Sequence, residues 1–151
     1  MKKETLYLDT SVISAYYDKR AVERQGATVK FWEDVSPHYK VFISEVALNE
    51  LEDTKNEDLK KKFRMISKDF HVLKISSKVR ALATVYINRG VFHEKYIDDA
   101  LHVAVATCHD ISYVVSWNFE HLVKVKTRKT VNLINILEGY KEIEIVSPQE
   151  L

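Results

Sequence analysis

The sequence predicts an α/β fold, a three-layer α/β/α sandwich with a mainly parallel central sheet of about five strands. Two observations lead to this fold class. Short apolar or β-branched runs recur along the chain, and amphipathic runs of helical period separate them. This alternation is typical of a parallel sheet with helices on both faces, because parallel strands need crossover connections. We expect the strands at residues 5–9, 41–44, 71–75, 113–116 and 143–146.

The first predicted strand, residues 5–9, is an apolar run that ends on the carboxylate of Asp9. Residues 12–17 follow after two hydroxyl residues and have the composition of a helix start. A second helix is predicted over residues 21–35, where apolar side chains lie among charged ones, although Gly26 weakens that pattern. The chain therefore opens with a strand followed by helical structure.

The second predicted strand, residues 41–44, leads into a helix over residues 45–54. Ser44 stands at the boundary, where serine is a preferred N-cap. A helix over residues 57–69 is predicted because apolar residues recur there at the i, i+4, i+7 spacing. Its acidic residues lie at the start and its basic residues further along, as the helix macrodipole favours.

Two more helices are predicted before the fourth strand. Residues 77–89 are amphipathic, and Gly90 is a suitable C′ residue after them. Residues 98–108 form the most apolar helix of the set, which indicates burial on most sides. Asp98 or Asp99 is expected to be its N-cap.

The end of the chain is predicted to contain one helix and one strand after the strand at residues 113–116. The helix covers residues 129–138 and ends at Gly139. The strand at residues 143–146 alternates in polarity and is soon followed by Pro148, which suits a last or edge strand.

Length and composition indicate one domain over residues 1–151. The hydrophobic share of 46% and the charged share of 30% are those of an ordinary soluble protein. The net charge of +1 means that any basic surface for nucleic acid must be local. No apolar run reaches the roughly 18 residues of a membrane span, and the N-terminus lacks a long apolar signal segment. Cys108, the single cysteine, lies in an apolar run and is expected to be a core residue. We therefore expect a cytoplasmic protein.

Polar side chains stand where several predicted strands end. Asp9 ends the first strand, and Glu50 lies in the helix after the second. Asp99 opens the apolar helix, and Asn118 follows the fourth strand. Open α/β sheets bind ligands at the carboxyl ends of their strands, so these positions can converge. Hard cations such as Mg²⁺ and Mn²⁺ take oxygen ligands, relieve repulsion among carboxylates, and activate water for attack on phosphorus.

Each of these residues also has a simpler interpretation. Asp9 can cap the following helix, and Glu50 can be an exposed helix residue. Asn118 suits a turn after a strand. Spacing alone leaves these alternatives open.

Four pieces of the chain carry a family resemblance, in order from near the N-terminus to about residue 122. They are Leu8-Asp9-Thr10-Ser11, the stretch from Ile43-Ser44-Glu45-Val46 to Glu50-Leu51, Asp99-Ala100-Leu101-His102 with the apolar run after it, and Val115-Ser116-Trp117-Asn118-Phe119-Glu120-His121-Leu122. In these pieces the chain resembles the PIN-domain family of metal-dependent ribonucleases, which includes the VapC-type toxins of toxin–antitoxin pairs.

The resemblance implies a PIN-like parallel sheet and a site for Mg²⁺ or Mn²⁺. The catalytic and metal-binding carboxylates would be Asp9, Glu50 and Asp99, with Asp99 preferred to its neighbour Asp98 because it directly precedes Ala100. The hydroxyls that would help to position a ligand or water are those of Thr10, Ser11 and Ser116. At Asn118 the sequence departs from the many members that carry a fourth Asp. An amide oxygen can ligate or hold a metal-bound water but brings no charge, which leaves one or two metals open.

The resemblance also implies a function and partners. The chain is expected to be a metal-dependent endoribonuclease that hydrolyses RNA phosphodiester bonds. As the toxin of a pair it would bind a small antitoxin that blocks the acidic site, and a homodimer would form through an apolar helix face. The alternative is a catalytically weak or inactive PIN-like module that binds RNA or protein, which Asn118 and the nearly neutral charge favour.

A basic stretch follows the fourth-strand motif and contains Lys124, Lys126, Arg128 and Lys129. It is interpreted either as a solvated surface loop or as a contact for RNA phosphates next to the metal site.

Other chemistries fit the sequence less well. His102 and His109 are seven residues apart and lack the spacing of zinc ligands. No glycine-rich phosphate loop exists. A haloacid-dehalogenase-like phosphatase would need a second Asp where Ser11 stands.

Overall fold

At the centre of the structure, a computed structural model, lies a five-stranded sheet whose neighbouring strands are all parallel. The structure describes residues 3–151. The strand order is β3-β2-β1-β4-β5, and the bounds are β1 Thr5–Leu8, β2 Lys40–Ser44, β3 His71–Leu73, β4 Tyr113–Val115 and β5 Glu144–Val146. All five predicted strands are confirmed, the last of them at an edge of the sheet.

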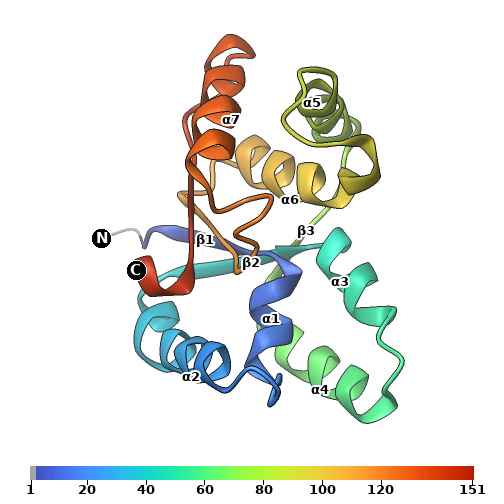
Figure 1. The fold of residues 1–151 in the computed structure, drawn as a ribbon, viewed down its shortest axis with the longest axis vertical. Helices are drawn as coiled ribbons and strands as arrows, with labels where there is room; N and C mark the ends of the chain where they lie inside the picture. The colour runs from blue at the N-terminus through green and yellow to red at the C-terminus, as the bar shows by residue number, and fades with distance from the viewer. Residues whose placement is uncertain (1–2) are drawn as a thin grey trace.

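Helices cover both faces of this sheet, which confirms the predicted three-layer α/β/α sandwich (Figure 1). On one side lie α1 (Thr10–Tyr16), α2 (Val22–Lys30), α3 (Glu45–Glu52) and α4 (Glu57–Ser67). On the other lie α5 (Ser77–Asn88), α6 (Ile97–Cys108) and α7 (Val125–Leu137). Short helical turns occupy Phe31–Val35, Ser36–His38, Glu94–Tyr96 and Pro148–Glu150. Within residues 3–151, no helix combines the length and the apolar character needed to cross a membrane.

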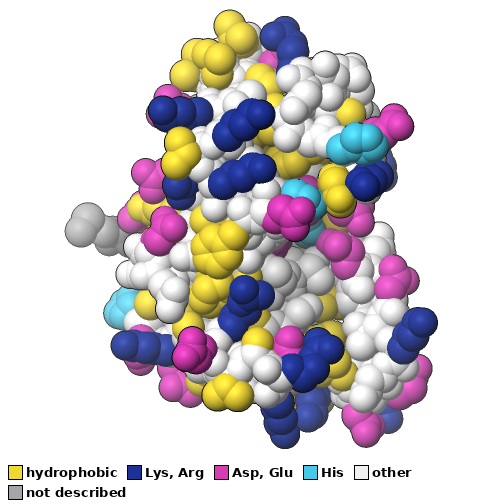
Figure 2. Space-filling view, in the orientation of Figure 1, with side chains coloured by type: hydrophobic (Ala, Val, Ile, Leu, Met, Phe, Trp, Pro, Cys, Tyr) yellow, Lys and Arg dark blue, Asp and Glu magenta, His cyan; other side chains and the backbone are white. Residues whose placement is uncertain are grey.

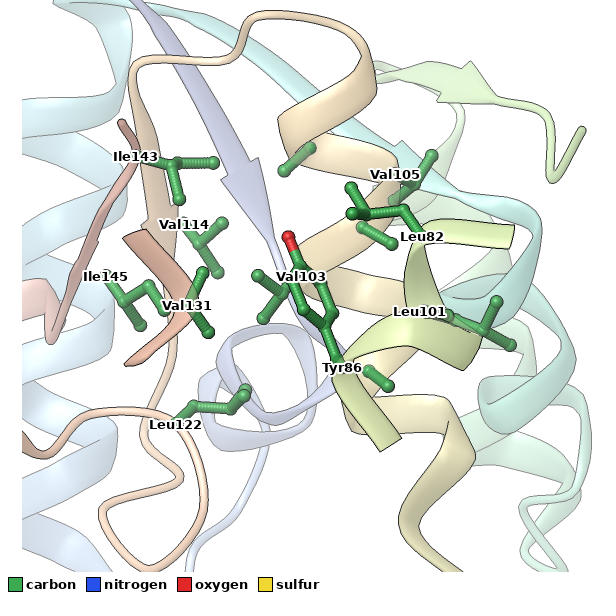
Figure 3. Close-up of a cluster of buried hydrophobic side chains, with 14 of the residues drawn as sticks. Leu82, Tyr86, Leu101, Val103, Val105, Val114, Leu122, Val131, Ile143 and Ile145 are labelled. Atoms are coloured by element: carbon green, nitrogen blue, oxygen red, sulfur yellow. The ribbon is translucent and has the colours of Figure 1, made fainter. Parts of the chain in front are cut away.

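Successive strand residues point to opposite helix layers, so β1 and β4 each contribute to two cores. Tyr7 and Val114 belong to the core beneath α5, α6 and α7, part of which Figure 3 shows. Their neighbours Leu8 and Val115 belong to the core on the side of α1 and α2. Burial on both faces explains why the central strands β1 and β4 are continuous apolar runs rather than alternating ones. Cys108 is half-buried and packs against the first core.

The sheet order brings the carboxyl ends of β1 and β4 together. Leu8 pairs with Val115 at the last matched position of these two strands. Asp9 and Ser116 therefore follow at neighbouring positions on one edge of the sheet. The strand order reverses beside β1, because β2 and β3 lie on one side of it and β4 and β5 on the other. Such a reversal creates the crevice in which open α/β sheets bind ligands.

Three of the predicted helix ends are confirmed. Ser44 Oγ accepts a hydrogen bond from Val46 N and caps α3. Gly90 and Gly139 follow the C-caps of α5 and α7 with φ angles of +78° and +83°. A residue with a side chain is strained in that conformation, so glycine is favoured there.

The predicted N-cap of α6 is wrong. The helix begins at Ile97, and Tyr96 occupies the N-cap position without a side-chain bond. The turn Glu94–Tyr96 leads directly into the helix, so Asp98 and Asp99 both lie inside its first turn. Neither aspartate is therefore needed as a cap.

The predicted boundaries of two other helices need correction. α7 begins at Val125 rather than at residue 129, so Lys126, Arg128 and Lys129 lie in the helix rather than in a surface loop, and Lys124 is the N-cap residue before it. No capping side chain marks this start, which is why the sequence pattern does not reveal it. The helix predicted over residues 21–35 changes to a π-helical turn at Phe31.

We predict that Tyr86→Phe lowers the free energy of unfolding by about 1–3 kcal/mol. The buried Tyr86 hydroxyl of α5 donates to Asn135 Oδ1 of α7 at 2.5 Å. Its removal leaves a buried amide oxygen without that donor. Urea unfolding followed by circular dichroism measures the change. Tyr39→Phe is the control, because its hydroxyl makes no hydrogen bond to another described residue; equal losses in both variants would contradict the prediction.

Candidate active site

Asp9 is a buried carboxylate at the carboxyl end of β1, only 5% exposed. Its Oδ1 accepts hydrogen bonds from Ser11 N at 3.1 Å and Ser11 Oγ at 2.5 Å, and its Oδ2 accepts one from Ser116 Oγ at 2.6 Å. The bond from Ser11 N makes Asp9 the N-cap of α1. Burial raises the pKa of Asp9; His102 and the two serines oppose that rise, and Asp99 adds to it.

Ser11 and Ser116 connect the loops that follow β1 and β4. Ser11 Oγ accepts a hydrogen bond from Trp117 N at 2.9 Å, and Ser116 Oγ accepts one from Asn118 N at 2.9 Å. Each hydroxyl therefore donates to Asp9 while it accepts from the β4 loop. Both serines, expected to support a ligand, here fix the orientation of a carboxylate.

Glu50 projects from α3 and is half-buried rather than fully exposed. Its Oε1 accepts hydrogen bonds from Thr10 Oγ1 at 2.7 Å and from His102 Nε2 at 2.6 Å. Burial alone would raise the pKa of Glu50, but the bonds from His102 and Thr10 outweigh it and hold that pKa below its ordinary value. Glu50 is therefore an ionised, oriented side chain and not a solvated helix residue.

Asp99 lies in the first turn of α6, and its Oδ2 accepts a hydrogen bond from His121 Nδ1 at 2.9 Å. Burial raises the pKa of Asp99, with His121 opposing the rise and Glu50 adding to it. The adjacent Asp98 is exposed. Of the two aspartates, Asp99 is thus the one that the fold holds in place.

Asn118 closes the turn after β4. Its Oδ1 accepts a hydrogen bond from His121 N at 2.9 Å. This is the turn role that its sequence position also suggests. The same turn places His121 against Asp99, with the rings of His121 and Tyr96 centred 4.1 Å apart.

His102, Tyr7 and Ser44 form a buried hydrogen-bonded group behind the acids, which the sequence motifs do not indicate. His102 Nδ1 lies 2.6 Å from the Tyr7 hydroxyl, which lies 2.7 Å from Ser44 Oγ. The charges of Asp9, Glu50 and Asp99 all raise the pKa of His102, against the lowering effect of its burial. A signal for this group exists in the sequence: Tyr7 is two residues before Asp9 on a strand, and His102 is one helical turn after Asp99.

The acids thus lie within electrostatic range of one imidazole, but they are not a preformed metal cage. Within residues 3–151, no group of three or more His, Cys, Asp or Glu side chains is arranged to hold a metal ion. Acidic and histidine side chains gather near the middle of the face in Figure 2. Glu50 and Asp99 each have one oxygen held by a histidine, while Glu50 Oε2 and Asp99 Oδ1 accept no hydrogen bond from the described residues. Such oxygen donors fit a hard divalent cation.

The basic stretch covers the N-cap residue and the first turns of α7. Lys124, Lys126 and Lys129 are exposed. Arg128 is half-buried; its Nη1 donates to Ile145 O at 3.4 Å and lies 3.8 Å from the Glu150 carboxylate. Arg128 therefore ties α7 to the C-terminal segment, whereas the lysines point to solvent.

Comparisons with known proteins agree with this fold. A family model described as the PIN domain matches residues 6–122. No curated protein sequence matches the chain. Among solved structures, the sarcin–ricin-loop-cleaving toxin VapC20 of Mycobacterium tuberculosis aligns with a TM-score of 0.62 and 20% identity over 77% of this chain and 92% of that one. VapBC2 from Rickettsia felis, bound to a promoter DNA fragment, aligns with a TM-score of 0.62 and 12% identity over 95% and 98% of the two chains. A toxin–antitoxin complex from Klebsiella pneumoniae aligns with a TM-score of 0.61 and 17% identity over 81% of this chain and 93% of that one.

The identities to these structures are low, so the structural likeness concerns the fold. The family model spans more than half of the chain and includes Asp9, Glu50, Asp99 and Asn118. The match also includes β2, β3 and β4 of the sheet. The chain belongs to the PIN-domain family.

Proposed function

We propose that this protein is an endoribonuclease that depends on Mg²⁺ or Mn²⁺ and hydrolyses RNA phosphodiester bonds. One observation carries the proposal: three carboxylates from β1, α3 and α6 lie around one buried imidazole at the ligand-binding edge of the sheet. Asp9, Glu50 and Asp99 would hold the cation. Burial opposes the ionisation of Asp9 and Asp99, and so does repulsion, from Asp99 on Asp9 and from Glu50 on Asp99. A cation would offset these effects.

The chain's own residues prepare this site. Ser11 and Ser116 fix both oxygens of Asp9, while Thr10 and His102 hold one oxygen of Glu50. A bound divalent cation supplies charge stabilisation and lowers the pKa of water for in-line attack on phosphorus. Asn118 contributes no charge, and its oxygen already accepts a backbone hydrogen bond. These facts support one main metal site.

The exposed lysines of α7 support an RNA contact beside this site. Lys124 and Lys126 follow the loop that carries Asn118 and His121. Figure 2 shows Lys and Arg side chains along the upper part of the face, above the acidic region. Phosphate contacts of this kind position a nucleic acid without reading its sequence.

We also propose that the protein is a toxin of the VapC type, whose small antitoxin covers the acidic site. Structures with this fold include toxin–antitoxin complexes, and a nuclease active in the cytoplasm would need such control. A homodimer through α7 is supported by the exposed apolar side chains of Leu133, Ile136 and Leu137. Light scattering on the purified protein measures its mass directly.

A non-catalytic PIN module that binds RNA or protein is the rival function. It is favoured by the lack of a preformed group of three metal-binding side chains among the described residues and by the turn role of Asn118. A Mn²⁺ titration separates the nuclease from the non-catalytic module. The nuclease should bind Mn²⁺ and lose that binding in Asp9→Asn, whereas the non-catalytic module should bind no Mn²⁺ in either form.

We predict that Asp9→Asn and Asp99→Asn each reduce RNA cleavage at least about 100-fold, since even residues behind a metal ligand can have effects of that size. Cleavage of a labelled RNA in Mn²⁺, with EDTA as the metal-free arm, measures this, and circular dichroism shows that the fold persists. Asp98→Asn is the matched control and should retain activity, because Asp98 is exposed and adjacent. Normal cleavage by both Asp9→Asn and Asp99→Asn would exclude the mechanism.

We predict that Asp9→Asn is more stable than the wild type at pH 7 without metal. The pKa of Asp9 is raised in the folded state, so ionisation costs stability above that raised pKa and costs nothing below the ordinary value of 3.8. The difference should therefore shrink as the pH falls towards 4 and reverse in saturating Mn²⁺, which binds the wild type. Thermal unfolding in EDTA and in Mn²⁺ tests this; a wild type that is more stable in EDTA at pH 7 would refute it.

We predict that the double variant Lys124→Glu/Lys126→Glu raises KM for RNA about tenfold and weakens its dependence on salt, because two phosphate contacts are lost. The kcat should change little. Acidic residues are favourable in a first helical turn, so α7 should persist. Lys61→Glu/Lys62→Glu on α4 makes the same charge change away from β4 and is the control. Equal effects from both pairs would remove the proposed RNA contact.

A further inference from the structure

Behind Glu50 lies a buried chain of polar groups formed by Ser44, Tyr7 and His102. We infer that this chain positions the Glu50 carboxylate for the divalent cation, with His102 as the positioning residue. The inference rests on the proposed metal site, and it assigns a role to residues that do not themselves ligate.

The chain is buried and closely bonded. Tyr7 and Ser44 are 0% exposed and His102 is 2% exposed. The Tyr7 hydroxyl lies 2.7 Å from Ser44 Oγ and 2.6 Å from His102 Nδ1, and His102 Nε2 lies 2.6 Å from Glu50 Oε1. Buried polar groups are destabilising unless they are paired, and every side-chain polar atom of this chain is paired. Its members come from β1, β2 and α6, so three elements fix one carboxylate.

The direction of these hydrogen bonds favours a fixed imidazole. Ionised Glu50 can only accept, so His102 Nε2 carries its hydrogen toward Oε1. In the neutral imidazole, the Tyr7 hydroxyl then donates to Nδ1 and accepts from Ser44. In the imidazolium, Nδ1 donates to Tyr7, and Tyr7 donates to Ser44. Both protonation states keep the same donor on Glu50, because Tyr7 can act as donor or acceptor.

The geometry leaves one Glu50 oxygen for a ligand. Thr10 Oγ1 and His102 Nε2 both donate to Oε1, and Oε2 accepts no bond from the described residues. Ser44 Oγ also caps α3 through Val46 N, so the same hydroxyl anchors the helix that carries Glu50. His102 follows Asp99 by one turn of α6 and also contacts Glu50. It therefore lies next to two of the acids, Glu50 and Asp99.

A core role alone makes a different prediction from a positioning role. If the chain only stabilises the fold, its loss changes unfolding but leaves metal affinity intact. If it positions Glu50, its loss weakens the binding of the cation even when the protein stays folded. Hydrogen-bond partners of metal ligands typically change metal affinity or activity about 10–100-fold.

The experiment measures Mn²⁺ binding to the metal-free full chain by electron paramagnetic resonance, with thermal unfolding in parallel. His102→Leu replaces the imidazole with an apolar side chain of similar size and so removes the donor to Glu50. We expect its Kd for Mn²⁺ to rise about 10–100-fold. His102→Gln can place an amide N–H near the Nε2 position and should recover much of the affinity. Tyr7→Phe removes the hydroxyl that contacts His102 Nδ1. Its affinity for Mn²⁺ should lie between those of His102→Leu and His102→Gln.

His109→Leu is the matched control, because His109 is an exposed histidine just after the same helix, and its Nδ1 bonds only Val105 O at 2.8 Å among the described residues. It should bind Mn²⁺ as the wild type does. His102→Leu, folded and with wild-type affinity, would overturn the inference. Should His102→Leu fail to fold, a folded Tyr7→Phe variant with wild-type affinity for Mn²⁺ would overturn the inference equally.

Asp9→Asn in the same titration separates this inference from the proposed function. Loss of Mn²⁺ in Asp9→Asn, with unchanged binding in His102→Leu, leaves the metal site standing and removes the role of His102. A wild type that binds no Mn²⁺ overturns both.

Discussion

The structure at the carboxyl edge of the sheet depends on how one buried carboxylate is satisfied. Asp9 ends β1 inside the protein, where ionisation is unfavourable. Ser11 and Ser116 each donate a hydroxyl to it and accept a backbone N–H of the β4 loop. The need to pair Asp9 thus joins the loops that follow two neighbouring strands. These hydrogen bonds fix the two loops that border the crevice produced by the strand order.

The other two acids are held by a second device, a histidine for each carboxylate. His102 holds one oxygen of Glu50 and His121 holds one oxygen of Asp99. In both cases the second oxygen accepts no hydrogen bond from the described residues. This arrangement keeps repelling carboxylates close without a cation, because each has a compensating donor. It also explains why the described side chains form no preformed cage although their charges interact.

Much of the fold follows from local sequence properties. All five strands and the layers of helices agree with the apolar pattern of the sequence, because the central strands β1 and β4 are buried on both faces and a typical surface helix has one apolar side. The observed starts of α6 and α7 differ from the predicted ones for a common reason. Tyr96 and Lys124 precede these helices without a capping side chain, so no residue-type signal marks either start. The position and type of each strand and α-helix were predictable, whereas the starts of α6 and α7, which follow short turns, were not predicted.

The sequence by itself determined the fold class and the identity of the acidic residues Asp9, Glu50 and Asp99, since strand ends and family motifs are properties of short segments. Only the tertiary structure decided how these residues are used. The pairing of Glu50 with His102, and of His102 with Tyr7, joins positions 52 and 95 residues apart in the chain. The tie from Arg128 to Glu150 was likewise invisible in the sequence. Hydrogen bonds between distant side chains depend on how helices pack across the sheet, and no local pattern encodes that packing.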